Sequence, residues 1–148
     1  MDGIIMANTK PIGVAYEDQN IINADLVSAT EIYATSKTGY ALSAYGTVTQ
    51  TGNKASGVTL NKSAGTITTS NAQLAPSAEV AFVVTNSQVS ALDTVVVNIA
   101  SGATATFAYV IAVVTVQDGS FTINLSNVSN NAYTDTLKIN YAIIHIGA

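Results

Sequence analysis

The stretch FAYVIAVVTVQ, residues 107–117, restricts what this chain can fold into more than any other part of it. It is rich in β-branched residues, which favour strands, and successive side chains of a strand point to opposite faces. Both faces of the expected strand are apolar: one carries Phe107, Tyr109, Ile111 and Val113, and the other carries Ala108, Val110, Ala112, Val114 and Val116. One apolar face can pack in the core, so the sequence predicts that something else covers the second one.

Short strand patterns, bounded by Gly, Asn, Ser or Asp, lie on both sides of this stretch. No segment of comparable strength has helical periodicity. The expected strands lie at residues 46–51, 57–60, 65–69, 79–85, 93–99, 107–117, 119–125 and 136–146. About eight short strands without helices indicate a two-sheet sandwich, and the eight-stranded form is a jelly roll. We therefore expect an all-β, jelly-roll-like β-sandwich over residues 46–148.

The pair Asp118-Gly119 lies between two strong strand patterns and predicts a hairpin. A two-residue hairpin loop favours a type I′ turn, in which both central residues have positive φ. The strand that follows alternates cleanly, with Phe121, Ile123 and Leu125 on the side that we expect to face the core.

Residues 1–45 differ from the rest of the chain, because they contain no sustained alternation of apolar and polar residues. We interpret them as an extended N-terminal arm. Its apolar residues are too many for a solvated tail: Ile12, Val14, Ile21, Ile22, Leu26 and Val27. A disordered terminus is the alternative, but the sequence favours an arm that becomes ordered on contact with a neighbouring molecule.

A sister subunit is the simplest cover for the second apolar face of residues 107–117. The last expected strand is also apolar on both faces. Leu137, Ile139, Tyr141 and Ile143 share one face, and Ala142, Ile144 and Ile146 lie on the other. The predicted subunit interface contains Val110, Ala112, Val114, Val116, Ile144 and Ile146. The alternative is a core strand that the arm of the same chain covers.

The composition agrees with a surface that is largely covered. Only 9% of residues are charged, whereas 48% are hydrophobic. The surface of a free monomer usually carries a higher share of charged residues. A net charge of −4 without arginine argues against nucleic acid as a partner. The apolar run is about half of the ~20 residues that span a bilayer, so we expect no membrane segment. The opening MDGIIMANTK has no secretory signal pattern, and we expect the chain to remain in the cytosol that made it.

The sequence offers little for catalysis, so we expect neither an enzyme nor a cofactor. His145 is the one histidine, and its apolar neighbours favour a core or interface role. A second histidine for a metal site is missing, and so is any cysteine. Glu17 and Asp18 would point to opposite faces of a strand, so they do not form a glycosidase pair. We predict no catalytic, cofactor-binding or metal-binding residues.

Several segments resemble small virion structural proteins of tailed bacteriophages. They are MANTKPIGVAYEDQ, GVTLNKSAGTITT, FVVTNSQV, VVVNIASG, GSFTINLSN and LKINYAII, which together cover most of the chain. The resemblance to such openings begins at Met6. It implies a trimeric β-sandwich that either cements capsomers at local three-fold positions or projects from the particle as a fibre.

The resemblance also implies partners and a location. In the cement or decoration reading, the homotrimer binds the major capsid protein on the outside of the virion, after synthesis in the host cytoplasm. The arm would then supply the capsid contacts through Ile12, Val14, Tyr16, Ile21, Ile22 and Leu26. In the fibre or receptor-binding reading, loops rich in Asn, Ser, Thr and Tyr would contact host surface glycans. The short chain favours the first reading.

Overall fold

A computed structural model describes residues 37–146 of the chain. All of them except Lys37 belong to one compact unit, which begins at Thr38. Within them the fold is all-β, apart from one short 3₁₀ turn, η1 (Leu42–Ala44). No helix in this described range is long and apolar enough to cross a membrane.

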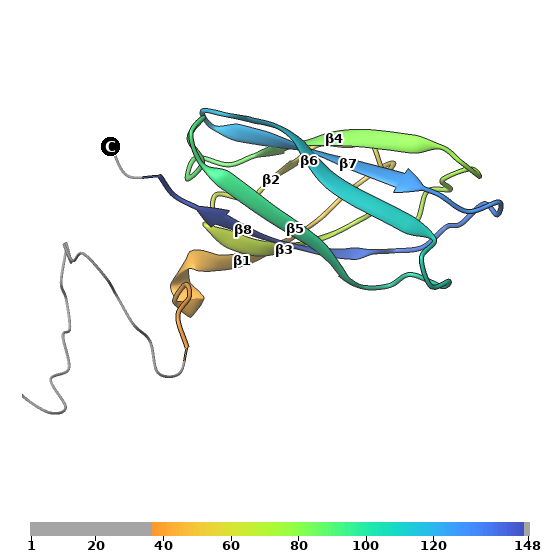
Figure 1. Ribbon diagram of the computed structural model, residues 1–148, viewed down its shortest axis with the longest axis horizontal. Helices are drawn as coiled ribbons and strands as arrows, with labels where there is room; N and C mark the ends of the chain where they lie inside the picture. Colours follow the sequence, from red (N-terminus) through yellow and green to blue (C-terminus); the bar gives the residue numbers. More distant parts are fainter. Residues whose placement is uncertain (1–36, 147–148) are drawn as a thin grey trace, which may run out of the picture. The chain divides into compact units, whose positions relative to one another are not determined.

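The strands form two mixed sheets of four strands each. Sheet A has the order β1-β3-β8-β5, with bounds Tyr45–Thr49, Ala64–Thr68, Lys138–Ile144 and Thr94–Ser101. Sheet B has the order β2-β4-β7-β6, with bounds Val58–Thr59, Glu79–Thr85, Ser120–Asn127 and Tyr109–Gln117. Figure 1 shows the sheets as two layers, and β5 and β6 lie next to each other where the edges of the layers meet.

Most strand pairs are antiparallel, but each sheet has one parallel pair at an edge. β1 pairs with β3 and β2 pairs with β4 in this way. β8, the last strand along the chain, lies between β3 and β5, and β7 lies between β4 and β6. The all-β prediction is confirmed, and each predicted strand range overlaps one of these strands.

The core lies between the two sheets and follows the alternation of the strands. β7 and β8 supply its centre, because both are flanked by a strand on each side. Their inward residues are buried: Phe121, Ile123, Leu125, Ile139, Tyr141 and Ile143. The rings of Phe121 and Tyr141 connect the two layers, with centroids 5.2 Å apart. Each fully buried side chain of this size contributes about 1.5–3 kcal/mol of transfer free energy.

The predicted hairpin joins β6 to β7, but its turn is not type I′. Gln117 pairs with Ser120, so Asp118 and Gly119 are the two loop residues. Gly119 has a φ of +79°, whereas Asp118 does not have positive φ. Contacts outside the hairpin explain the difference: Gly119 donates its amide to the Val89 carbonyl, and the Asp118 carboxylate accepts the Ala91 amide. The loop before β5 therefore sets the turn geometry.

Candidate interaction surfaces

The outer face of sheet B carries an uncovered apolar row along its edge strand, β6. We call Val110, Ala112 and Val114 the β6 stripe. Val110 and Val114 are 54% and 56% exposed, and Ala112 is exposed as well. In the central strand β7, by contrast, the residues opposite Val110 and Ala112 are Ser126 and Asn124. Within the described residues β6 pairs with β7 alone, so its other edge has free backbone donors and acceptors.

Val116 was expected on this outer face, and that expectation was wrong. The pairing of β6 with β7 shifts register between Val113 and Thr115, which is a β-bulge at Val114. A bulge inserts one residue, so the alternation reverses beyond it. Val116 therefore lies opposite the buried Phe121 and packs against the core.

A second apolar area lies on the outer face of sheet A, near the end of β8. It contains the other two predicted interface residues, Ile144 and Ile146, both about half exposed. Val96 of β5 pairs with Ala142 of β8 and continues the area. We call these four residues the sheet A corner. The rest of that outer face is polar, with threonine and asparagine side chains at most positions.

His145 lies beside the sheet A corner and makes a specific pair with Asp93. Its Nδ1 lies 3.0 Å from the Asp93 Oδ2 atom. The other Asp93 oxygen accepts the Ile146 amide, and the Ser90 amide donates to Oδ2. The Ser90 amide is the main reason that the pKa of Asp93 is lowered to about 2, with smaller contributions from Ile146 and His145. Since the histidine side chain is 43% exposed, it is neither a core residue nor part of a closed site.

The loop between β5 and β6 presents an aromatic residue to solvent. Phe107 is 90% exposed and has a φ of +58°. It was expected within a strand over residues 107–117, but β6 begins only at Tyr109. A left-handed φ is strained for a bulky residue, so the surrounding contacts must hold it there. The sequence pattern did not reveal this, because Phe107 fits the alternation of the strand that follows.

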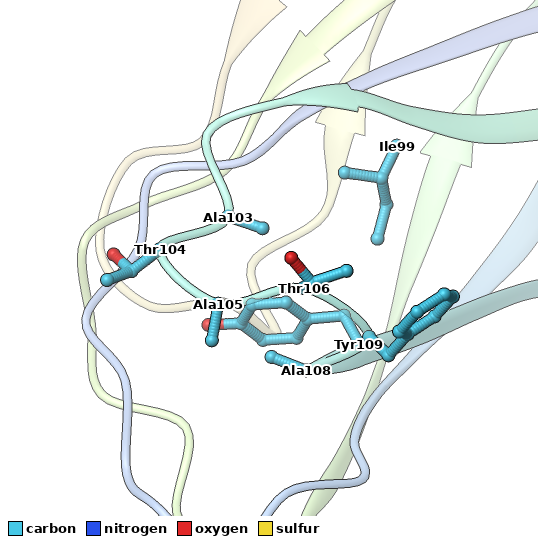
Figure 2. Close-up of a pocket in the computed structure, with 8 residues that line it drawn as sticks. Ile99, Ala103, Thr104, Ala105, Thr106, Ala108 and Tyr109 are labelled. Atoms are coloured by element: carbon cyan, nitrogen blue, oxygen red, sulfur yellow. The ribbon is translucent and has the colours of Figure 1, made fainter.

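Asp135 holds this loop in place. Its carboxylate accepts the Thr104 amide at 2.9 Å, the Thr104 hydroxyl, and the Tyr109 hydroxyl at 3.1 Å. Burial acts to raise the pKa of Asp135, but the Thr104 hydrogen bonds outweigh it and keep the pKa below its usual value. Residues 103–109 and Ile99 line a shallow cavity of about 290 Å³. Figure 2 shows the Tyr109 ring among the side chains of Ala105, Thr106 and Ala108.

Lys54 is a buried cation that the sequence pattern also gave no reason to select. It is 3% exposed, and its ammonium donates to the Ser70 and Asp135 carbonyls and to the Thr69 hydroxyl. Burial lowers the pKa of this amine. Because three acceptors occupy its three N–H groups, the amine joins loops rather than offering a nucleophile.

The remaining predicted site residues, the arm contacts Ile12, Val14, Tyr16, Ile21, Ile22 and Leu26, lie outside the described residues. Over residues 37–146, no group of three or more His, Asp or Glu side chains is placed to hold a metal ion. Comparison of the chain with protein-family models, curated proteins and solved structures gave no match.

Proposed function

We propose that this chain is a structural protein of a bacteriophage particle. It assembles as a homotrimer and decorates the outside of the capsid, where it stabilises the shell by bridging capsomers. The fold in this proposal is a jelly-roll-like sandwich with parallel pairs, β1/β3 and β2/β4, at the sheet edges.

The β6 stripe is the observation that carries self-assembly. Edge strands of soluble monomers usually carry charges, proline or a cover, because free backbone groups attract other strands. β6 has nine residues and no charged side chain, and its outward valines are more than half exposed. A second subunit would cover the apolar row and remove the unprotected edge from solvent.

The capsid assignment is supported by the sequence resemblance and by the sparse charge of the chain. The trimer would bind the major capsid protein through its arm, with Ile12, Val14, Tyr16, Ile21, Ile22 and Leu26 in contact with the shell. Ordering an arm costs conformational entropy, and burial of apolar side chains of this kind offsets that cost.

The test has two steps. Light scattering on the purified protein should give three times the 15.2 kDa chain mass. Undecorated shells of the phage that encodes the chain should then bind the full chain and withstand greater heat or osmotic shock. A chain without residues 1–25 should remain a trimer and fail to bind those shells. Equal binding by both proteins would show that the arm is not the anchor.

A fibre or receptor-binding module is the second candidate, and the outer face of sheet A favours it. Tyr45 and Asn140 both lie within 2.6 Å of the Thr66 hydroxyl, and further threonines flank this row. Hydroxyl and amide groups beside a tyrosine suit a glycan. In this case the arm deletion would reduce adsorption to host cells and leave shell stability unchanged.

A further inference from the structure

The basic residues of this chain are all lysine, and they differ in how well a protease can reach the bond that follows each of them. Proteases of the trypsin type bind a basic side chain before the cut bond, because an acidic group in their pocket pairs with the cation. They also need the backbone around that bond to be exposed and unpaired. The five positions are Lys10, Lys37, Lys54, Lys62 and Lys138.

The bond between Lys37 and Thr38 meets both requirements. Residues 37–41 are exposed and precede the first regular element of the described chain. The backbone of residues 37–40 makes no hydrogen bond with another described residue. Gly39 has no described atom within 4 Å of the position that a Cβ would take, so the segment is not crowded. The Tyr40 hydroxyl, which donates to the Ile143 carbonyl, makes the first hydrogen bond to the sandwich.

The bond between Lys62 and Ser63 is blocked, because its carbonyl is already used inside the fold. This carbonyl accepts the Tyr141 hydroxyl at 2.9 Å and the Asn86 side-chain amide at 2.8 Å. The Ser63 carbonyl accepts the Ile143 amide. A serine protease has to place the carbonyl of the cut bond in its own oxyanion hole. A cut here therefore requires these hydrogen bonds to break first.

The remaining three lysines are protected in other ways. Lys54 is buried, and its ammonium already has three acceptors. Lys138 begins β8, which pairs with β3 on one side and with β5 on the other. Lys10 lies outside the described residues, but Pro11 follows it in the sequence. A proline after the lysine impairs binding to the protease, since its ring fixes φ and removes the N–H group.

We propose that the bond between Lys37 and Thr38 is a processing site for a protease of the trypsin type. Within residues 37–146 it is the one bond after a lysine that such a protease can cut while the sandwich stays folded. The cut breaks the C–N bond, and water supplies a hydroxyl to the Lys37 carbonyl carbon and a proton to the Thr38 nitrogen. The buried apolar residues of the described core run from Val58 to Ile143, so the cut removes none of them.

The free chain is a sufficient substrate, so this site does not depend on the proposed capsid function. The consequence of the cut on a particle does rest on that function. Hydrolysis would release residues 1–37, which contain all of the predicted capsid contacts, and would leave the sandwich without its anchor.

Limited digestion of the full chain with trypsin tests the site. Intact mass spectrometry should show one first cut, after Lys37, while circular dichroism shows that the sandwich remains folded. Cuts after Lys62 or Lys138 should be at least about a hundredfold slower, because they need an opened state that is rarely populated. A first cut after either of these two lysines overturns the proposal, and so does resistance of the bond after Lys37.

Two variants show that the bond itself is recognised. Lys37→Gln removes the cation, and Thr38→Pro places a proline after the lysine, so each should abolish the first cut. Lys138→Gln is the matched control, because Lys138 is exposed as well, and it should leave the rate of that cut unchanged. Rapid release of the same fragment from Thr38→Pro would contradict the assignment. Light scattering tests the trimer separately: a monomer that is cut first after Lys37 supports this site and overturns the proposed assembly.

Discussion

β6 and β7 are neighbours in sheet B and have similar inner faces but opposite outer faces. On the inside, Ile111 and Val113 of β6 pair with Leu125 and Ile123 of β7. On the outside, the β6 stripe is apolar, whereas the β7 residues are Ser120, Thr122, Asn124 and Ser126. The central strand thus has the outer face of a soluble protein, and the edge strand does not.

This difference shows which apolar residues of a strand indicate assembly and which indicate only the fold. Burial explains every inward side chain of both strands, so those residues report only on the fold. A valine at a strand edge gains nothing from the core, and the backbone beside it is unpaired. The outer face of β6 therefore points to assembly, while the outer face of β7 is compatible with solvent.

The largest effect is expected for the shared inner face. Ile123→Ala in β7 should lower the free energy of unfolding by about 2–5 kcal/mol, because Ile123 is fully buried and its removal leaves a cavity. Asn124→Ala, one residue along and facing outward, should change the free energy by less than about 0.5 kcal/mol. Urea denaturation followed by circular dichroism measures both. Similar losses for the two variants would mean that β7 has no distinct inner face.

The next effect concerns the two sides of the bulge in β6. Val114→Asp should give a folded monomer, since an unpaired carboxylate in an apolar contact costs several kcal/mol. Val116→Asp should instead impair folding, because Val116 packs against the core. Light scattering and circular dichroism together distinguish these outcomes. Thr47→Asp, on exposed β1, is the control that should remain a folded trimer. A Val114→Asp trimer would remove the β6 stripe from the interface.

A smaller effect should appear in the melting temperature. If the edge of β6 is covered by another subunit, folding and association are coupled, and the melting temperature should rise with protein concentration. Scanning calorimetry over a hundredfold range of concentration checks this. EDTA should leave the melting temperature unchanged at each concentration. A concentration-independent value would favour a cover from within the same chain.

The smallest effect is expected in the loop that fixes the β6–β7 turn, at Asp93. Its folded-state pKa of about 2 lies below the usual 3.8, so the folded state binds fewer protons than the unfolded state in that interval. The stabilisation by Asp93 should be complete above about pH 4 and disappear as the pH falls through about 2. Asp93→Asn should lose this part of the acid dependence. Acid titrations of both proteins, followed by circular dichroism, check this. The same pH dependence in the two proteins would refute the assignment.

Alternation in the sequence predicted the strands well, because each strand has one buried face. Residues 79–85 match β4 at both ends, and the inward set of β7 is as expected. The errors lie where a bulge or a contact from another segment overrides the local pattern. The bulge turned Val116 inward, the loop before β5 changed the Asp118-Gly119 turn, and Asp135 holds Phe107 out of the strand.

The candidate surfaces were only partly predictable for the same reason. Val110, Ala112, Val114, Ile144 and Ile146 are exposed apolar residues, and their role in a subunit interface stays a prediction. A hollow lined by residues 53–55, 72–74, 79 and 80 combines separate segments of the chain, and no periodic pattern marks such a site. Lys54 is similar, since its three acceptors lie up to 81 residues away.

The position of β8 has a consequence for how the molecule acquires its fold. Sheet A has β8 between β3 and β5, so β1 and β3 cannot join β5 until residues 138–144 are available. Nascent chains shorter than this would leave the inner face of sheet B uncovered, and the core between the two sheets should form only after synthesis of the last strand. Distant pairing of this kind gives slow folding, on the order of milliseconds to seconds. Stopped-flow refolding should therefore show no fast phase that completes sheet A, and chains that end before β8 should be captured by chaperones.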